Sequence, residues 1–243
     1  ASEAASIAMV DRAREAGYET LILTVDVPQV SRRIRDLRNG FNLPFSMTPS
    51  AFWDFATHPK WSLTTLLAGT PSPKNFIDDN GKIRFNRNGN RAGANWDFFK
   101  LLRKKWPGKL IVKGVTSTDD AKRVKNLGAD AIYVSNHGGR QLDSVPPAIQ
   151  LLPLIREAVG SDFPLLFDSG IRNGEDIVKA LALGADFTMI GRPALLALGA
   201  EGVAGLSALL DCFCEDISVV MAQLGMKSID DIKAHTAYSF ATR

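Results

Sequence analysis

The sequence predicts an α/β protein built on a parallel sheet, because five short apolar runs alternate with amphipathic stretches. Polar or charged residues stand at the carboxyl end of every run. Alternation of this kind is typical of parallel strands that are joined by helices. The five predicted strands are residues 20–27, 110–115, 131–135, 164–168 and 187–191.

The joints between helices and strands indicate a repeated βα unit. Leu127-Gly128-Ala129-Asp130 precedes the third run, Leu183-Gly184-Ala185-Asp186 precedes the fifth, and Ala16-Gly17-Tyr18-Glu19 is a looser copy before the first. Glycine is the residue expected just past a helix C-terminus. Capping signals predict two helices, over residues 121–127 and 177–183.

Two architectures place ligands where these polar strand ends lie. In a (β/α)8 TIM barrel the carboxyl ends of the strands meet at one mouth, and in an open doubly wound sheet they also face the ligand. We favour the barrel. Because such a barrel has eight strands, we expect residues 1–243 to carry about the last five βα units, as the C-terminal part of a single barrel domain. Three strands would then precede residue 1 in a longer chain or come from another polypeptide.

Residues 41–93, after the first predicted strand, break the alternation with several prolines and glycines. Segments of this kind are usually functional insertions or partly disordered, so we expect an insertion loop. Its aromatic residues are interleaved with lysines and arginines, a mixture that suits an anionic membrane surface. Packing of the aromatic residues onto the barrel, with the basic residues in solvent, is the open alternative.

Composition excludes several classes of protein. With 45% hydrophobic residues and a formal charge of +3, the chain lacks the basic surface of a nucleic-acid binder. We see no run of about 18 apolar residues and no charged-then-apolar leader, and so expect neither a membrane span nor a secretory signal. Cys212 and Cys214 stand in a predicted helix at a spacing that does not suit a disulfide. The three scattered histidines predict no metal site.

The run Ser135-Asn136-His137-Gly138-Gly139-Arg140-Gln141-Leu142-Asp143 follows the third strand directly. Its paired glycines permit backbone angles and close ligand approach that a Cβ would prevent. Histidine can take a proton near neutral pH, and arginine can hold an anion. A structural histidine in a glycine turn is the alternative for this motif taken alone, but the polar ends of the other strands favour an active-site loop.

Five motifs, in this order, resemble those of the FMN-dependent L-2-hydroxy acid dehydrogenases and oxidases, which include lactate and mandelate dehydrogenases and glycolate oxidase. The resemblance runs from about Val10 to Ile232. The motifs are Leu-Thr-Val-Asp-Val-Pro (23–28), Ile-Val-Lys-Gly (111–114), the run 135–143, Asp-Ser-Gly-Ile-Arg-Asn-Gly (168–174) and Ile-Gly-Arg (190–192).

The resemblance implies a role for each matching residue. His137 matches the base that takes a proton from the substrate, and Asp26 matches the carboxylate that stabilises the protonated base. Arg140 and Arg33 match the two guanidiniums that hold the substrate carboxylate. The implied contacts to the cofactor FMN come from Thr24, Lys113, Ser135, Asp168, Gly170, Arg172, Gly191 and Arg192.

The resemblance also implies an activity, the oxidation of a lactate-like or mandelate-like L-2-hydroxy acid to the 2-keto acid, with electrons passed to a quinone or another acceptor. Residues 57–61 look more like the bacterial dehydrogenases than the oxidases, so we favour a dehydrogenase. An oxidase that uses oxygen and a non-catalytic barrel fragment are the alternatives. The family implies a homotetramer. We expect a cytoplasmic protein that is peripheral on the inner membrane if residues 41–93 contact lipid.

Overall fold

The computed structural model describes residues 3–29, 38–40, 47–69 and 93–234. The chain divides into two compact units. The smaller unit spans residues 30–89, and the larger one combines residues 2–29 with residues 90–243. All the predicted strands belong to the larger unit.

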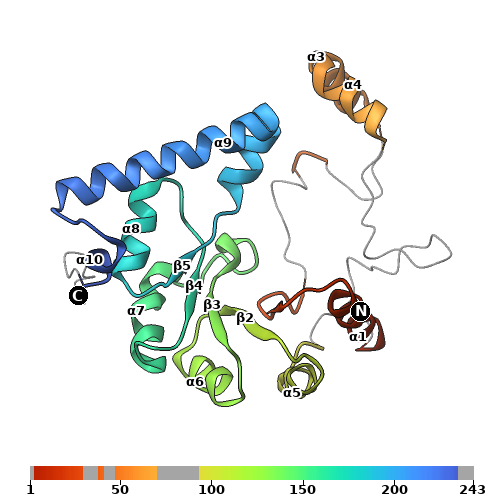
Figure 1. The fold of residues 1–243 in the computed structure, drawn as a ribbon. Helices are drawn as coiled ribbons and strands as arrows, with labels where there is room; N and C mark the ends of the chain where they lie inside the picture. The colour runs from red at the N-terminus through yellow and green to blue at the C-terminus, as the bar shows by residue number, and fades with distance from the viewer. Residues whose placement is uncertain (1–2, 30–37, 41–46, 70–92, 235–243) are drawn as a thin grey trace. The chain divides into compact units, whose positions relative to one another are not determined.

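The larger unit contains a five-stranded parallel sheet whose strands lie in chain order, β1-β2-β3-β4-β5 (Figure 1). A doubly wound sheet reverses its strand order at a switch point, whereas a barrel adds each βα unit beside the previous one. The observed order agrees with the predicted barrel units. The strands are β1 (Thr20–Thr24), β2 (Lys109–Val115), β3 (Ala131–Val134), β4 (Leu165–Phe167) and β5 (Phe187–Thr188).

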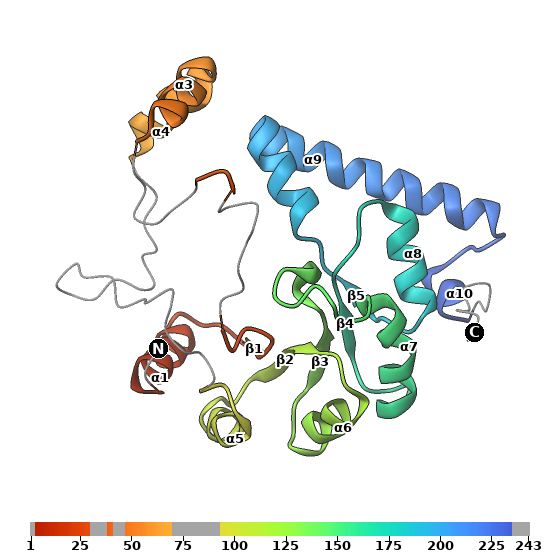
Figure 2. The same cartoon turned by 180° about the vertical axis from the view of Figure 1, so that it is seen from behind.

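The helices of this unit are α1 (Glu3–Glu15), α5 (Trp96–Lys105), α6 (Thr118–Asn126), α7 (Ala148–Val159), α8 (Gly174–Ala182), α9 (Arg192–Gln223) and α10 (Ile229–Ala234). Helices α6 and α8 begin three residues before the predicted ranges, because the side chains of Ser117 and Asn173 accept hydrogen bonds from their first turns. Gly128 and Gly184 follow these two helices with positive φ, which confirms the repeated joint. Figures 1 and 2 show α6, α7 and α8 together on the same side of the sheet.

The two faces of the sheet differ in chemistry, because successive side chains of a strand point to opposite faces. One face carries residues such as Leu110, Ile132 and Leu165, which join the main hydrophobic core with the helices. The other face has a smaller apolar layer that includes Tyr133 and ends in polar side chains. The helices therefore cover the core, and the polar groups gather at the carboxyl ends of the strands.

A bulge in β2 decides which side chains reach this polar end. The pairing of β2 with β3 shifts register between Lys113 and Val115. Gly114, between them, has a φ of +98°, which favours glycine. In an unbroken strand Lys113 and Val115 would share a face. Because of the bulge, Val115 turns into the helix-covered core while Lys113 stays among the polar groups.

An arginine clamp ties α5 to the amino end of the sheet. Arg103 donates hydrogen bonds to the carbonyl oxygen of Gly128 and to Asp130 Oδ2, the latter at 2.7 Å. The same Asp130 oxygen accepts the backbone N–H of Leu110 at the start of β2. Lys109 adds a second cation at 3.2 Å from Asp130 Oδ1. A helix, a helix-to-strand joint and a strand are thus joined through one carboxylate.

The same clamp recurs two βα units later. Arg156 of α7 donates to the carbonyl oxygen of Gly184 and to Asp186 Oδ2, the latter at 2.6 Å. This oxygen of Asp186 accepts the backbone N–H of Leu165 at the start of β4. Lys233 of α10 lies 3.0 Å from Asp186 Oδ1. The repeated Gly-Ala-Asp joint of the sequence is therefore a repeated structural clamp.

We expect the clamps to make folding stability depend on acid pH. Burial would raise the pKa of Asp130 and of Asp186, but the strand N–H and the neighbouring cations outweigh burial and hold each pKa below its ordinary value. The carboxylates therefore stabilise the fold fully above about pH 4, and this contribution is lost as the pH falls further. Asp130→Asn and Asp186→Asn should lower the melting temperature at pH 7 and flatten its fall on acidification, measured by circular dichroism.

A matched control for this prediction is Asp97→Asn. The side chain of Asp97 is 88% exposed and pairs only with Lys100, one turn away on α5. Surface pairs of this kind contribute little to stability. Asp97→Asn should therefore melt and respond to acid like the unmodified protein. If the Asp130 variant did the same, the clamp would not be a source of stability.

The smaller unit contains two helices within the predicted insertion loop, α3 (Pro49–Thr57) and α4 (Pro59–Ala68). These parts of the predicted insertion are therefore helical, with a proline at the start of each helix. Proline is favoured at the first helical position, where its missing N–H costs no hydrogen bond. Thr48 caps α3 by accepting the N–H of Ala51, and the rings of Phe55 and Trp61 pack at 5.3 Å. Residues 41–46 and 70–92 lie outside the described residues.

Helix α9 differs from an expectation drawn from the sequence. It has 32 residues with a kink at Gly202, and among the described residues it alone is long and apolar enough to cross a membrane by length and composition. The sequence had indicated no run that long, because Glu201 and the glycines interrupt it. However, Phe213 of α9 is buried in the main core, and the helix packs against α8. The contact makes α9 part of the helical layer around the sheet.

Candidate active site

Predicted site residues meet at the carboxyl ends of neighbouring strands. Asp26 follows β1, Lys113 lies near the end of β2, Ser135 follows β3 and Asp168 follows β4. Parallel strands present these ends at one edge of the sheet, where α/β proteins bind their ligands. Contacts link the residues into two groups, Asp26 with His137, and Lys113 with Ser135 and Asp168.

The first group is a carboxylate and an imidazole. Asp26 Oδ1 lies 3.2 Å from His137 Nδ1. Because a carboxylate only accepts, we assign the ring proton to Nδ1, which leaves Nε2 free to take a proton. The side chain of His137 is 32% exposed and that of Asp26 is 13% exposed. The ring can therefore reach a ligand while its partner is shielded. Asp26 Oδ2 is buried without a hydrogen-bond partner in the described part of the chain.

The second group surrounds Lys113. Its Nζ donates to Ser135 Oγ at 2.6 Å, lies 3.0 Å from Asp168 Oδ2, and stands 4.4 Å above the ring centroid of Tyr133. Burial would raise the pKa of Asp168, but hydrogen bonds from Ser135 and Ser169 and the charge of Lys113 outweigh it and hold that pKa below its ordinary value. Burial and the charge of Asp168 raise the pKa of Tyr133. At neutral pH Asp168 is therefore a carboxylate and Tyr133 a neutral phenol.

The turn η2 (His137–Gly139) holds His137 in an unusual backbone conformation. Both His137 and Gly138 have left-handed φ values, of 57° and 66°. Ser135 Oγ accepts the N–H of His137 at 3.0 Å. Arg192, at the start of α9, donates to the carbonyl oxygen of Gly138 at 3.1 Å. The positive φ of Gly138 favours glycine there, and a Cβ would lie 2.9 Å from the movable end of the Arg192 side chain.

Of the two predicted substrate-binding arginines, only Arg140 lies within the described residues. Arg140 ends the η2 turn on the exposed surface, and its backbone N–H donates to the carbonyl oxygen of His137 at 3.3 Å. This hydrogen bond places the backbone of Arg140 one turn after that of His137. Arg33 lies outside the described residues.

The remaining predicted cofactor residues flank the same edge. Thr24 ends β1 and pairs in register with Lys113. Gly170 follows β4 and Gly191 precedes α9, and a Cβ at either glycine would meet no heavy atom within 4 Å. The guanidinium of Arg172 donates to the neighbouring carbonyl oxygen of Ile171. The space that a side chain would occupy at these two glycines is therefore open.

Two further residues of the site were missed by our reading of the sequence. Ser169 has a φ of +81° and hydrogen-bonds the loop that carries His137. Gly114 lies directly beneath Asp26, because a Cβ there would lie 2.6 Å from the Cβ and Cγ atoms of Asp26. Both residues stand inside matched motifs, next to Asp168 and Lys113. Their position beside predicted site residues was the only available signal, since these contacts are tertiary.

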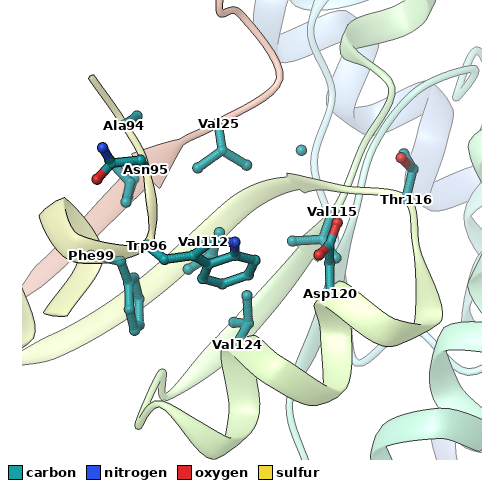
Figure 3. A pocket seen from close by; sticks show the side chains of 12 residues that line it. Val25, Ala94, Asn95, Trp96, Phe99, Val112, Val115, Thr116, Asp120 and Val124 are labelled. Carbon is teal, nitrogen blue, oxygen red and sulfur yellow. The ribbon is translucent and has the colours of Figure 1, made fainter. Parts of the chain in front are cut away.

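A cavity of about 240 Å³ lies beside β2, and its lining is mainly apolar but includes Gly114. Figure 3 shows Trp96 and Phe99 of α5 facing it together with Val112 and Val115 of β2. The guanidinium of Arg123 covers the Trp96 ring at 4.1 Å. Most of its walls belong to the hydrophobic core, and Gly114 is a residue that the cavity shares with the candidate active site.

Comparisons with known proteins agree with this geometry. The family described as FMN-dependent dehydrogenase matches residues 1–239. The L-lactate dehydrogenase of Vibrio cholerae serotype O1 (strain M66-2) is 40% identical over 235 residues, which cover 92% of this chain and 61% of that protein. The L-lactate dehydrogenase of Pseudomonas entomophila (strain L48) is 39% identical over 234 residues, which cover 92% of this chain and 60% of that protein.

Solved structures give the same result. The crystal structure of the monotopic membrane protein (S)-mandelate dehydrogenase matches with a TM-score of 0.87 and 39% identity, covering 93% of this chain and 61% of that one. The crystal structure of a mandelate oxidase matches with a TM-score of 0.73 and 35% identity, covering 96% of this chain and 60% of that one.

Fold and comparisons therefore define a barrel-type α/β protein, and the chain belongs to the FMN-dependent dehydrogenase family. The predicted α/β architecture, with five βα units of a TIM barrel, is confirmed. The chain spans 61% of the length of the Vibrio cholerae relative.

Proposed function

We propose that the protein containing this chain catalyses the FMN-dependent oxidation of an L-2-hydroxy acid to the 2-keto acid. The observation that carries the proposal is the pair of His137 and Asp26, 3.2 Å apart at the edge of the sheet where Lys113 also lies. Such an oxidation needs a base with a stabilised protonated form and a cation near developing negative charge. The named lactate and mandelate dehydrogenases support the same reading.

The side chains at this edge fit FMN. The buried hydroxyl of Ser135 and the ammonium of Lys113 suit the polar edge of a flavin ring, with Thr24 as a further hydroxyl on β1. The open glycines Gly170 and Gly191, with Arg172 and Arg192 nearby and Asp168 at the end of β4, suit a ribityl phosphate held by backbone N–H groups and cations. Bound FMN would accept the two electrons of the oxidation.

The protein side chains supply the binding and the proton transfer. Arg140, together with Arg33, would hold the substrate carboxylate through bidentate hydrogen bonds. His137 Nε2 would take one of the two protons that the hydroxy acid loses on oxidation, and the other would go to the flavin with the two electrons. Asp26 would stabilise the resulting imidazolium through Nδ1, at the distance of 3.2 Å seen in the structure.

The direct test is anaerobic addition of L-lactate or L-mandelate to the FMN-loaded protein. We expect the yellow flavin absorbance to bleach with an L-2-hydroxy acid and not with its D-enantiomer. FMN that stays bound and oxidised with every L-2-hydroxy acid tried would contradict the proposed reaction. A protein that binds no FMN would favour the non-catalytic barrel fragment.

We infer a dehydrogenase rather than an oxidase. The membrane-bound dehydrogenase matches the fold with a TM-score of 0.87, against 0.73 for the mandelate oxidase. The oxidase remains the second candidate, because mandelate oxidases share the fold and 35% of the sequence. Turnover with a quinone or a dye under nitrogen would support the dehydrogenase, and oxygen consumption with release of hydrogen peroxide would support the oxidase.

We also propose that α3 and α4, within residues 41–93, form a peripheral membrane contact. Neither helix has a buried residue. Trp53 is 68% exposed, Leu66 77% and Leu67 89%. Scattered exposed leucines are ordinary, but exposed aromatic and aliphatic residues gathered on two successive helices mark an interaction surface. The relative described as a monotopic membrane protein supports this proposal.

Replacing Leu66 and Leu67 together by serine should weaken sedimentation of the protein with phosphatidylglycerol vesicles. Each buried CH₂ group contributes about 0.8 kcal/mol to membrane binding, so the loss should exceed tenfold in affinity. Leu154→Ser is the matched control, since Leu154 is 51% exposed on α7 and lies outside the smaller unit. If the two variants sediment equally with the vesicles, α4 does not contribute to membrane binding.

The homotetramer and the cytoplasmic location at the inner membrane remain predictions. Both predictions concern the whole protein, and this chain covers only 61% of the length of the Vibrio cholerae relative. Light scattering of the purified protein would test the oligomeric state.

A further inference from the structure

We propose that Ser169 is a positioning residue that ties the loop carrying His137 to the strand end carrying Asp168. The inference deepens the proposed function and rests on it for its catalytic meaning. Ser169 is the second residue after β4, and the motif that contains it implied no role for it. It acts through its neighbours rather than on a reacting atom.

Three hydrogen bonds use the whole capacity of the Ser169 hydroxyl. Its Oγ accepts the backbone N–H of Asn136 at 3.2 Å and that of Gly138 at 3.0 Å, and it donates to Asp168 Oδ1 at 2.7 Å. A serine hydroxyl has one donor and two acceptor positions, so all are filled. The two amides flank His137 on either side. The hydroxyl therefore fixes the backbone of the base from both neighbouring residues.

Backbone strain points to the same residue. Among the described residues, the only non-glycine residues with positive φ are His137 at 57° and Ser169 at 81°. Side chains rarely adopt this region, and strained residues persist where their surroundings over-determine them, often at functional sites. Glycine would be free of strain at position 169 but would lack the hydroxyl. The strained backbone at Ser169 thus places its hydroxyl against the loop of His137, whose backbone is also strained.

The anchor also links the two groups of the site. Asp168 accepts the hydrogen bond of Ser169 with Oδ1, and its other oxygen lies 3.0 Å from Lys113 Nζ. A continuous set of polar contacts therefore runs from Lys113, through Asp168 and Ser169, to the loop of His137. Through this connection the side chains proposed to hold the flavin also fix the place of the base.

The test compares Ser169→Ala with Ser169→Gly in the FMN-loaded protein. Both variants remove the hydroxyl, but only glycine also removes the strain. We expect amide hydrogen exchange at Asn136 and Gly138, followed by NMR, to become about tenfold faster in both variants. The glycine variant should melt at the same or a higher temperature than the alanine variant. Turnover should fall about tenfold in both, because small displacements of a base are costly.

Ser161→Ala is the matched control. Ser161 also donates to the aspartate next to it, at 3.0 Å from Asp162 Oδ1, but it is exposed and remote from the loop. It should leave exchange at Asn136 and Gly138 and turnover unchanged.

Unchanged exchange in both Ser169 variants would overturn the proposal. Faster exchange in the alanine variant alone would assign the effect to strain and overturn it equally, as would failure of both variants to fold. The exchange readout needs no turnover. If the proposed reaction is wrong, the unmodified protein will show no flavin reduction, yet the exchange result will still decide whether Ser169 positions the loop.

Discussion

Replacing His137 by glutamine should lower turnover with an L-2-hydroxy acid by a factor on the order of 100 to 10,000, while FMN stays bound. Glutamine can keep a hydrogen bond to Asp26, which lies 3.2 Å from the imidazole, but it cannot take a proton. Loss of the base should therefore act on the chemical step. Steady-state kinetics and the flavin absorbance of the purified variant measure the two parts of this expectation.

His58→Gln is the control for this experiment. His58 lies between α3 and α4 in the smaller unit, and its ring is bound to Asp54 of α3. The same substitution there should leave turnover with a soluble dye unchanged. A His137 variant with turnover close to that of the unmodified protein would show that another group takes the proton.

Replacing Gly114 by alanine should lower turnover about 100-fold, the cost associated with a displacement of roughly 1 Å in a catalytic group. The new Cβ would lie 2.6 Å from the Cβ and Cγ atoms of Asp26, closer than carbon atoms can approach. Asp26 must then move away from His137. ¹⁵N NMR of the neutral imidazole should show loss of the Nδ1–H form that the Asp26 contact selects.

Gly160→Ala separates this effect from backbone strain. Gly160 has a φ of +85°, close to the +98° of Gly114, but a Cβ there would meet no atom within 4 Å. Both variants should lose stability, because alanine is strained at positive φ. Only the Gly114 variant should change the form of the imidazole. The same change in the Gly160 variant would mean that general loosening of the fold is responsible.

The fold was predictable where sequence pattern and tertiary structure have the same cause. Apolar runs such as residues 131–134 must be covered on both faces, so they reveal strands directly. In the smaller unit, by contrast, the prolines did not reveal the secondary structure. Pro49 and Pro59 look like loop residues, but a proline that starts a helix and one that interrupts it are the same letter in the sequence.

The candidate site was predictable only as a set of residues. Asp26 and His137 stand 111 residues apart, and only the pairing of β1, β2 and β3 brings their side chains to 3.2 Å. The resemblance to a family identified these two residues but not the distance between their side chains. Ser169 and Gly114 were missed because a positive φ and a close backbone contact are properties of the folded chain. The place of Arg33 remains a prediction, since it lies outside the described residues.

The arginine clamps and the candidate site lie at opposite ends of the same strands. Arg103 binds Asp130, which accepts the N–H of Leu110 near the start of β2, and Lys113 reaches the site from near the end of that strand. Substitutions that share no partners and lie more than about 10 Å apart usually add independently. New side chains in the loops after the strands can therefore alter the accepted substrate without drawing on the stability supplied by Arg103 and Arg156. Because of this separation, substrate specificity can change during evolution while the folding stability of the sheet is preserved.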